Sequence, residues 1–231
     1  MAKPASDTKA ALSRCVLFKT VTPAVLAELA ESARTFNVRR GARIFGTSER
    51  CPGVYILVNG RVMLSVGDQP DANKVVDLIG SGGHFGLATA ILDGPQTIAA
   101  DALMDSNLIM VPRAVLLDSA RTHPEVAMNI AAALSRGIVS LTGDIEAYSL
   151  HSGRQRVANY LLRIATVNAA RARPFPLPAK KSIIASRLGL TPEYFSRMLH
   201  DLIVARAIVV EGRQITILDA SLLRGDQSAA A

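Results

Sequence analysis

The 231-residue sequence predicts an α+β protein with an N-terminal antiparallel β-barrel, a long central helix and a C-terminal winged helix-turn-helix. Three observations support this fold class. Short apolar runs separated by glycines fill residues 36–111. Apolar residues with helical spacing continue without a break from Pro124 to Leu150. Near the C-terminus, the pattern of two helices joined by a turn is followed by that of a β-hairpin. The expected domain boundaries are 1–123, 124–152 and 153–231.

The N-terminal residues form a short helical region before the first strand. Residues 1–10 contain few apolar side chains and are predicted to be disordered. A helical pattern covers residues 12–33, where Thr22 can cap a helix that Pro23 opens without losing a hydrogen bond.

The next part of the chain has the spacing of short strands. Glycines separate the runs, a pattern typical of an antiparallel sandwich or a closed barrel. Residues 86–92 interrupt the strands as a brief helical insert. The predicted strands are Phe36 to Arg40, Ala42 to Phe45, Val54 to Val58, Val62 to Val66, Val75 to Ile79, Ile98 to Leu103 and Leu108 to Val111.

A short exit helix from Pro112 to Ala120 leads to the long helix from Pro124 to Leu150, whose apolar side chains are three or four residues apart. This spacing is close to that of a coiled-coil seam and favours dimerisation, although a helix packed only on its own barrel would show a similar stripe. A hinge is expected at residues 151–153. The predicted dimer seam consists of Ile130, Leu134, Ile138, Leu141, Ile145 and Tyr148, preceded by Ala127.

A helix-turn-helix pattern lies between Ile184 and about Ala205. The preceding helix, striped by Val157 to Ala165, is expected to end at the proline-rich residues 171–178. Gly189 falls where a sharp turn needs positive φ, and Thr191 followed by Pro192 can begin the second helix. The buried face of that second helix is predicted from the spacing of Phe195, Met198, Leu199 and Leu202.

The other face of the second helix carries side chains suited to contact base edges in a major groove. Glu193 and Arg197 could instead form a surface ion pair of little consequence. The β-branched runs Ala207 to Glu211 and Gln214 to Leu218 favour a winged helix over a chance pair of helices. The predicted DNA-binding residues are Thr191, Glu193, Tyr194, Ser196, Arg197 and His200.

The charge distribution agrees with a DNA-binding C-terminal region. Residues 151–231 contain 12 Lys and Arg against 5 Asp and Glu, which accounts for the whole net charge of +7. Such an excess suits contacts with the phosphates of double-stranded DNA rather than with a membrane. No apolar run reaches the roughly 18 residues that span a bilayer, and no signal peptide is evident, so a cytoplasmic protein is expected.

The order of these elements closely resembles the Crp/Fnr superfamily of bacterial transcription regulators over roughly Leu12 to Leu223. The specific motifs are residues 55–62, YILVNGRV, and residues 193–197, EYFSR, which is similar to the reading helix of the FNR branch. Residues 192–198 and 211–219 look most like the DNR type within that branch. The resemblance implies a jelly roll like that of cyclic-nucleotide-binding domains, a homodimer, and RNA polymerase as a partner. It also implies a half-site resembling TTGAT, with Arg197 donating to guanine.

The sensor region departs from the members of this family that bind cyclic nucleotides. Leu87 stands where they have a ribose-binding Glu, and Thr97-Ile98 stands where they have the phosphate-binding Arg-Ser or Arg-Thr pair. A buried phosphate would lack its partners, which argues against cyclic AMP. The effector pocket is expected to involve His84, Leu87, Ala90, Ile91 and Thr97.

The two cysteines, Cys15 and Cys51, exclude a four-cysteine iron–sulfur cluster and are interpreted as reduced thiols. Haem, and with it a nitric oxide signal, is a candidate because the DNR resemblance implies it. His84 is then the axial ligand to test first, although a histidine at a strand end is more often a surface residue.

Two functional interpretations remain from the sequence. The first is a transcription regulator gated by a small molecule or by a gas or redox signal, in which an effector biases the hinge near Ser152. The second is a DNA-binding regulator that needs no effector, with the barrel as a dimerisation scaffold. An enzyme finds little support, because the sequence has neither a nucleotide-binding glycine loop nor clustered carboxylates with defined acid and base roles.

Overall fold

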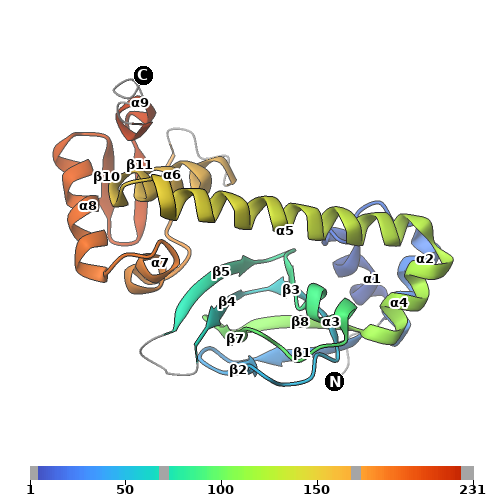
Figure 1. Ribbon diagram of the computed structural model, residues 1–231. Helices are drawn as coiled ribbons and strands as arrows, with labels where there is room; N and C mark the ends of the chain where they lie inside the picture. Colours follow the sequence, from blue (N-terminus) through green and yellow to red (C-terminus); the bar gives the residue numbers. More distant parts are fainter. Residues whose placement is uncertain (1–4, 68–72, 168–172, 225–231) are drawn as a thin grey trace. The chain divides into compact units, whose positions relative to one another are not determined.

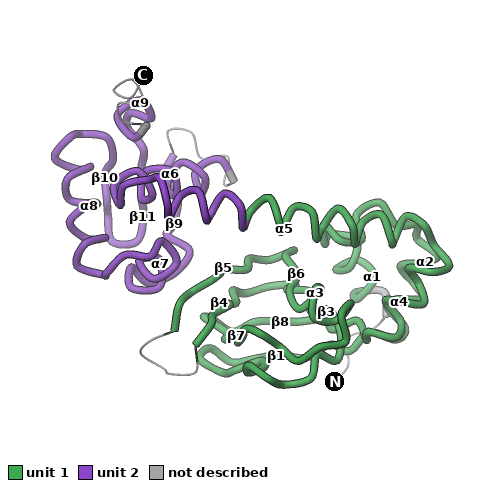
Figure 2. Tube along the Cα trace, viewed as in Figure 1, with its two compact units in different colours: residues 1–140 green, residues 141–231 purple. Residues whose placement is uncertain are grey.

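The computed structural model describes residues 5–67, 73–167 and 173–224. The chain divides into two compact units, residues 1–140 and 141–231 (Figure 2). Antiparallel sheets and helices form the first unit, and helices with a small sheet form the second (Figure 1). The α+β fold class predicted from the sequence is therefore confirmed.

The strands of the first unit form two four-stranded antiparallel sheets. They make a jelly-roll-like sandwich rather than the closed barrel that the sequence predicted, because the edge strands of one sheet do not pair with those of the other. The strand β6, only two residues long, was not predicted. In spatial order, one sheet consists of β1 (Arg34–Val38), β8 (Ser106–Pro112), β3 (Gly53–Asn59) and β6 (His84–Phe85), and the other of β2 (Arg43–Phe45), β7 (Ala99–Ala102), β4 (Arg61–Val66) and β5 (Lys74–Gly80).

The central strand β3 is buried on both of its faces. Its side chains alternate, so that Val54 and Ile56 join one hydrophobic cluster while Tyr55 and Leu57 join another. The second cluster fills the space between the two sheets, where the Tyr55 and Phe85 rings stack at 5.2 Å. Burial on both faces explains why this strand appears in the sequence as a continuous apolar run.

Helices cover the outer face of the sheet that contains β3. Their apolar side chains form the first cluster together with Val54 and Ile56. The prediction of disorder for residues 1–10 is wrong from Ala5 onward, because Thr8 and Leu12, one helical turn apart, are both buried; residues 1–4 lie outside the described residues. The helices of this unit are α1 (Ala5–Arg14), α2 (Pro23–Ser32), α3 (Leu87–Leu92), α4 (Arg113–Thr122) and the first part of α5 (Pro124–Leu150).

The second unit has the winged helix-turn-helix arrangement expected from the sequence. The hairpin β10–β11 follows α8 and is extended by β9, which was not predicted because two prolines flank Phe175. Proline lacks an N–H donor and is tolerated at the edge of a sheet, which is where β9 lies. The elements are α6 (Gly153–Val167), β9 (Phe175–Pro176), α7 (Lys181–Arg187), α8 (Pro192–Val204), β10 (Ile208–Glu211), β11 (Gln214–Ile217) and α9 (Ala220–Arg224).

Gly60 connects β3 and β4 in a conformation that strongly favours glycine. Its φ is +115°, and a Cβ atom there would lie 2.2 Å from Ser106 Oγ, which itself donates to the Met104 carbonyl. We expect Gly60→Ala to lower the free energy of unfolding by about 1–3 kcal/mol, measured by urea denaturation. Gly80→Ala is the matched control, since its Cβ would meet no atom within 4 Å, and an equal loss in both variants would contradict this explanation.

Candidate nucleic-acid interface

The turn between α7 and α8 is closed by the backbone of Gly189 and Leu190. The Leu190 N–H donates to the Ala185 carbonyl at 2.9 Å and the Gly189 N–H donates to the Ser186 carbonyl at 3.1 Å. This is the Schellman arrangement, which requires a left-handed residue, and the φ of Gly189 is +66°. The first helix of the pair therefore ends where the sequence predicted.

The start of α8 is fixed by its cap. Thr191 Oγ1 accepts a hydrogen bond from the Tyr194 N–H at 3.2 Å, and Pro192 occupies the first helical position. Thr191 is thus held in place as the cap of the helix whose first two turns carry the polar side chains.

The two faces of α8 have opposite character. Its apolar face is buried against the rest of the unit through Phe195, Met198, Leu199 and Leu202. Its other face is open to solvent, and there the structure brings together Glu193, Ser196, Arg197 and His200. Four polar side chains on one accessible helical face can donate to and accept from base edges in a DNA groove.

Arg197 does not form the surface ion pair that the sequence allowed. Within the described ranges, no ion pair joins it to Glu193, and its guanidinium lies instead over the Tyr194 ring, 4.9 Å from the centroid. Tyr194 differs from the other predicted contacts because it is half-buried. Its ring therefore stacks against the Arg197 guanidinium and also borders the exposed face of the helix.

Basic side chains that the sequence reasoning did not single out lie exposed elsewhere in the same unit. Lys180 and Lys181 are at the start of α7, and Arg213 is at the tip of the β10–β11 hairpin. The excess of basic residues after position 150 was the signal for such contacts, but it did not distinguish one residue from another. Positive charges of this kind suit DNA phosphates.

The side chains of α5 fall into two groups. Ile130 is 7 % exposed and belongs to the core of the first unit, and Leu134 packs against that core. Ile138, Leu141 and Ile145 are instead 65 %, 54 % and 65 % exposed. Because Ile130 is covered within its own chain, only the C-terminal part of the predicted seam is exposed.

Tyr148, also predicted in the seam, contacts its own chain. Its hydroxyl donates to the Arg187 carbonyl at 2.5 Å. By length and composition alone, α5 is also apolar enough to cross a membrane. Three residues of this helix, Val126, Ile130 and Ala133, are buried in the core of the first unit, and a single helix of this kind is weak evidence for a membrane span.

Most of the predicted effector residues lie on or beside α3. Leu87 is 5 % exposed and Ala90 is fully buried, both facing the core of the first unit, and Ile91 packs against the same cluster. Thr97 is exposed. The structure therefore brings Leu87, Ala90 and Ile91 together as packing residues and places Thr97 at the surface.

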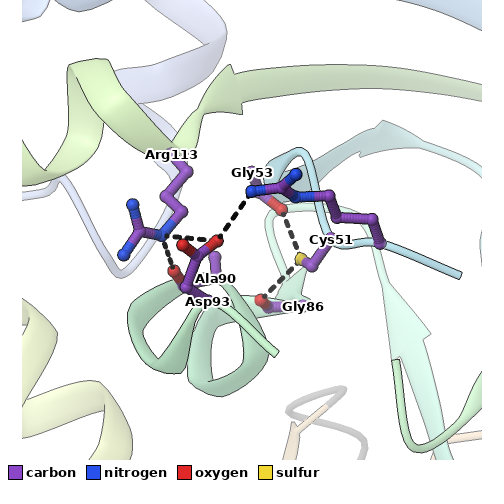
Figure 3. Close-up of polar contacts among 7 residues, drawn as sticks. Cys51, Gly53, Gly86, Ala90, Asp93 and Arg113 are labelled. Carbon is purple, nitrogen blue, oxygen red and sulfur yellow. Dashed lines mark hydrogen bonds and ion pairs between the residues drawn. The ribbon is translucent and has the colours of Figure 1, made fainter. Parts of the chain in front are cut away.

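Polar contacts that the sequence did not reveal hold both ends of α3 (Figure 3). Arg113 Nε donates to the Ala90 carbonyl at 2.7 Å and lies 3.4 Å from Asp93 Oδ1. At the start of α3, the Cys51 thiol lies 3.3 and 3.5 Å from the carbonyl oxygens of Gly53 and Gly86, either of which can accept its proton. Because Arg113 is the first residue of α4, these contacts connect the insert to the helix that leads into α5.

Burial keeps both cysteines in the thiol form. It raises the pKa of Cys15 to about 11 and also raises the pKa of Cys51, in both cases because the thiolate would lose its hydration. Thiols of this kind are poor nucleophiles and poor metal ligands. This agrees with their interpretation as ordinary reduced cysteines.

His84 has the protonation state that a metal ligand needs. It lies on β6 opposite Ile56 and is half-buried. Burial lowers its pKa from the usual 6.5, and the nearby positive charge of Arg136 on α5 lowers it further. The imidazole is therefore neutral at pH 7, the form that binds iron.

Comparison with known proteins assigns both units. Residues 35–123 match the cyclic nucleotide-binding domain family, and residues 155–225 match the Crp-like helix-turn-helix domain family. The chain is 22 % identical over 215 residues to the CRP-like cAMP-activated global transcriptional regulator of Mycobacterium tuberculosis, covering 92 % of this chain and 96 % of that protein.

Two relatives named FixK are similar in sequence and in structure. The nitrogen fixation regulation protein FixK of Azorhizobium caulinodans is 28 % identical over 192 residues, covering 80 % of this chain and 75 % of that protein. The structure of FixK2 from Bradyrhizobium japonicum is 28 % identical with a TM-score of 0.76, covering 86 % of this chain and 99 % of that one. The Mycobacterium and Azorhizobium relatives are regulatory proteins by their descriptions.

The lowered pKa of His84 predicts that the first unit loses stability in acid. As the pH falls below 6.5, the unfolded chain takes up a proton that the folded chain resists, so folding becomes less favourable. We expect urea denaturation at about pH 8 and about pH 5.5 to show a smaller acid-dependent loss for His84→Gln than for the wild type. His200→Gln, which removes an exposed histidine from α8, is the control; equal pH dependence of all three proteins would refute the assignment.

Proposed function

The chain belongs to the Crp/Fnr superfamily of transcription regulators, and from this premise we propose that it acts as a homodimer that binds a palindromic DNA site with FNR-like half-sites. The observation that carries the proposal is the exposed polar face of α8, with Arg197 in its second turn. The proposed half-site resembles TTGAT, in which Arg197 donates two hydrogen bonds to guanine O6 and N7.

The contacts of Arg197 suit this role. Stacked over Tyr194 and without a carboxylate partner among the described side chains, its guanidinium retains its donors for a base. Glu193, Ser196 and His200 flank it on the same face, while Lys180, Lys181 and Arg213 are placed on other elements to contact phosphates. Base contacts would give specificity and phosphate contacts would give salt-sensitive affinity.

The exposed stripe of α5 supports a symmetric partner. Ile138, Leu141 and Ile145 recur at intervals of three and four residues, as in a coiled-coil seam. A second copy of α5 would cover them, and a two-fold dimer would present two recognition helices to two half-sites. Leu134 borders this seam, and Tyr148 lies at its C-terminal end.

The first unit is proposed to sense a small-molecule effector other than cyclic AMP. The Mycobacterium relative is described as cAMP-activated. In this chain, however, the position expected to bind ribose is Leu87, which is packed in the core, and the position expected to bind phosphate is Thr97, which has no charge. A nucleotide phosphate at this site would therefore lack the arginine that the cyclic-nucleotide-binding members supply at this position.

Haem is supported only in part by these residues. His84 supplies a neutral, half-buried imidazole of the kind that can ligate iron. Leu87 and Ala90 are packed into the core, so the ring of a haem would have to displace α3. An optical spectrum of the protein mixed with haem, for the wild type and for His84→Ala, tests the ligand directly.

The alternative function is a regulator that needs no effector, with the sandwich as a scaffold. The packed α3 is the observation that favours it. Operator affinity separates the effector-gated regulator from the effector-independent one. It is measured for protein prepared in air and for protein prepared without oxygen and treated with nitric oxide. In either case the proposed location is the cytoplasm, and RNA polymerase is the proposed partner at the promoter.

We expect Arg197→Ala to lose preference for the palindrome while retaining weak binding to any duplex. The loss of one bidentate contact is worth about 1–3 kcal/mol of discrimination per half-site. Competition gel shifts with the specific site and with random DNA measure it. Lys181→Ala is the contrasting variant, since Lys181 is exposed and its loss should weaken binding to both duplexes alike; unchanged specificity in Arg197→Ala would disprove the assignment.

We expect Ile145→Glu to separate the dimer and to reduce affinity for the full palindrome, because a charge would enter the seam. Sedimentation velocity gives the oligomeric state. Val139→Glu is the matched control, since Val139 is 72 % exposed but lies about a third of a turn from the stripe. A dimer that survives Ile145→Glu unchanged would rule out this seam.

A further inference from the structure

A buried ion pair connects the C-terminal end of α5 to the first helix of the helix-turn-helix. Arg187 Nη2 lies 2.7 Å from Asp144 Oδ2, and Arg187 Nη1 donates to the Tyr148 hydroxyl at 3.3 Å. That hydroxyl in turn donates to the Arg187 carbonyl at 2.5 Å. We call Asp144, Tyr148 and Arg187 the interhelix clasp.

Arg187 is the buried member of the clasp, while Asp144 is partly exposed and Tyr148 is 38 % exposed. Arg187 is 5 % exposed as a residue, and the Asp144 side chain is 25 % exposed. For comparison, the side chains of the ion pair between Arg43 and Asp101 in the first unit are 53 % and 17 % exposed. Removing one partner of a buried pair leaves the other charge unpaired, so this contact strongly favours one arrangement of the two helices.

The clasp lies beside the two-residue break between α5 and α6. Only residues 151 and 152 separate α5 from α6, and the new helix is capped by Ser152 and Gln155. Such a short break can serve as a pivot, because a few backbone dihedrals absorb a large rotation. Arg187 lies 43 residues after Asp144, so the ion pair connects the chain before this break to the chain after it.

A second set of contacts lies beside the clasp. The Arg156 guanidinium lies 5.7 Å from the centroid of the Tyr148 ring, and a Cβ atom at Gly153 would lie 2.4 Å from the Tyr194 ring. Thus the end of α5, the start of α6 and the recognition helix meet closely around the break.

We infer that Arg187 and Asp144 are positioning residues that set which spacing between two half-sites the dimer accepts. The inference rests on the proposed function. If two copies are joined along α5, the separation of their recognition helices depends on the angle between α5 and the helix-turn-helix. The clasp fixes that angle, and the dimer then tolerates only one spacer length, because half-sites must match the two-fold geometry of the protein.

The experiment compares palindromes with identical half-sites and different spacers. The wild type should prefer one spacer length over spacers that are one or two base pairs longer or shorter. In Asp144→Asn and Arg187→Met this preference should fall by about an order of magnitude, or about 1.4 kcal/mol. Affinity for a single half-site should change little, which also reports that α8 is folded.

Two further variants separate positioning from general damage. The double variant Asp144→Arg, Arg187→Asp restores an ion pair and should recover part of the spacer preference lost in the single variants. Asp101→Asn breaks the exposed pair with Arg43 and should leave that preference unchanged. If single variants with normal half-site affinity discriminate spacers as the wild type does, the inference is overturned.

A distance measurement without DNA distinguishes failure of the proposed DNA-binding function from failure of the clasp. Spin labels at Glu146→Cys on α5 and Val204→Cys on α8 report the distance between the two helices, in labelled chains diluted with unlabelled chain. The distribution should be narrow with the clasp and broad in Arg187→Met. If the protein binds no palindrome but Arg187→Met still shows this broadening, the proposed function is wrong and the clasp remains a positioning contact. Equal distributions with and without Arg187 would overturn the clasp itself.

Discussion

The apolar side chains of α5 fall into a buried group and an exposed group that follow one another along the helix. Val126, Ile130 and Ala133 complete the core beneath the helices of the first unit. About one to three turns later, Ile138, Leu141 and Ile145 are exposed to water. A row of large apolar side chains along one helix is a poor surface for a free monomer, which is why a second copy is the occupant that best fits it.

The same core connects the sensor region to α5. Leu87 of α3 and Ile130 of α5 belong to one hydrophobic cluster, and Arg113 ties the end of α3 to the start of α4. Packed cores rearrange between discrete states rather than deforming smoothly. An effector that moved α3 would therefore disturb the packing of α4 and α5 together.

Local sequence signals were sufficient to predict the elements whose boundaries and buried faces are set by neighbouring residues. The cap at Thr191, the glycine at 189 and the apolar spacing from Phe195 predicted the helix-turn-helix closely, because each signal acts within a few residues. The strands β6 and β9 were missed because two residues have no periodicity, and only their pairing partners define them.

Contacts between residues far apart in the sequence could not be predicted from such local signals. The heptad-like spacing placed Ile130 in the dimer seam, but spacing alone does not tell the core of the same chain from a partner, and Ile130 faces its own core. The choice between barrel and sandwich depends on which edge strands pair. The pairing of Asp144 with Arg187 joins residues 43 positions apart and leaves no local pattern at either.

Tyr194 shows how the hinge and the base-reading side chain depend on each other. Its ring packs so closely on the start of α6 that a Cβ atom at position 153 would force the ring to shift, and the same ring also contacts the Arg197 guanidinium. A rotation at residues 151 and 152 would move Gly153 relative to the ring and remove the support of Arg197. The clasp opposes that rotation, since Arg187 is held by two residues of α5 and cannot follow a swing of the domain without exposing an unpaired charge. Specificity for the base and specificity for the spacing would then have a common physical origin in the packing around this break.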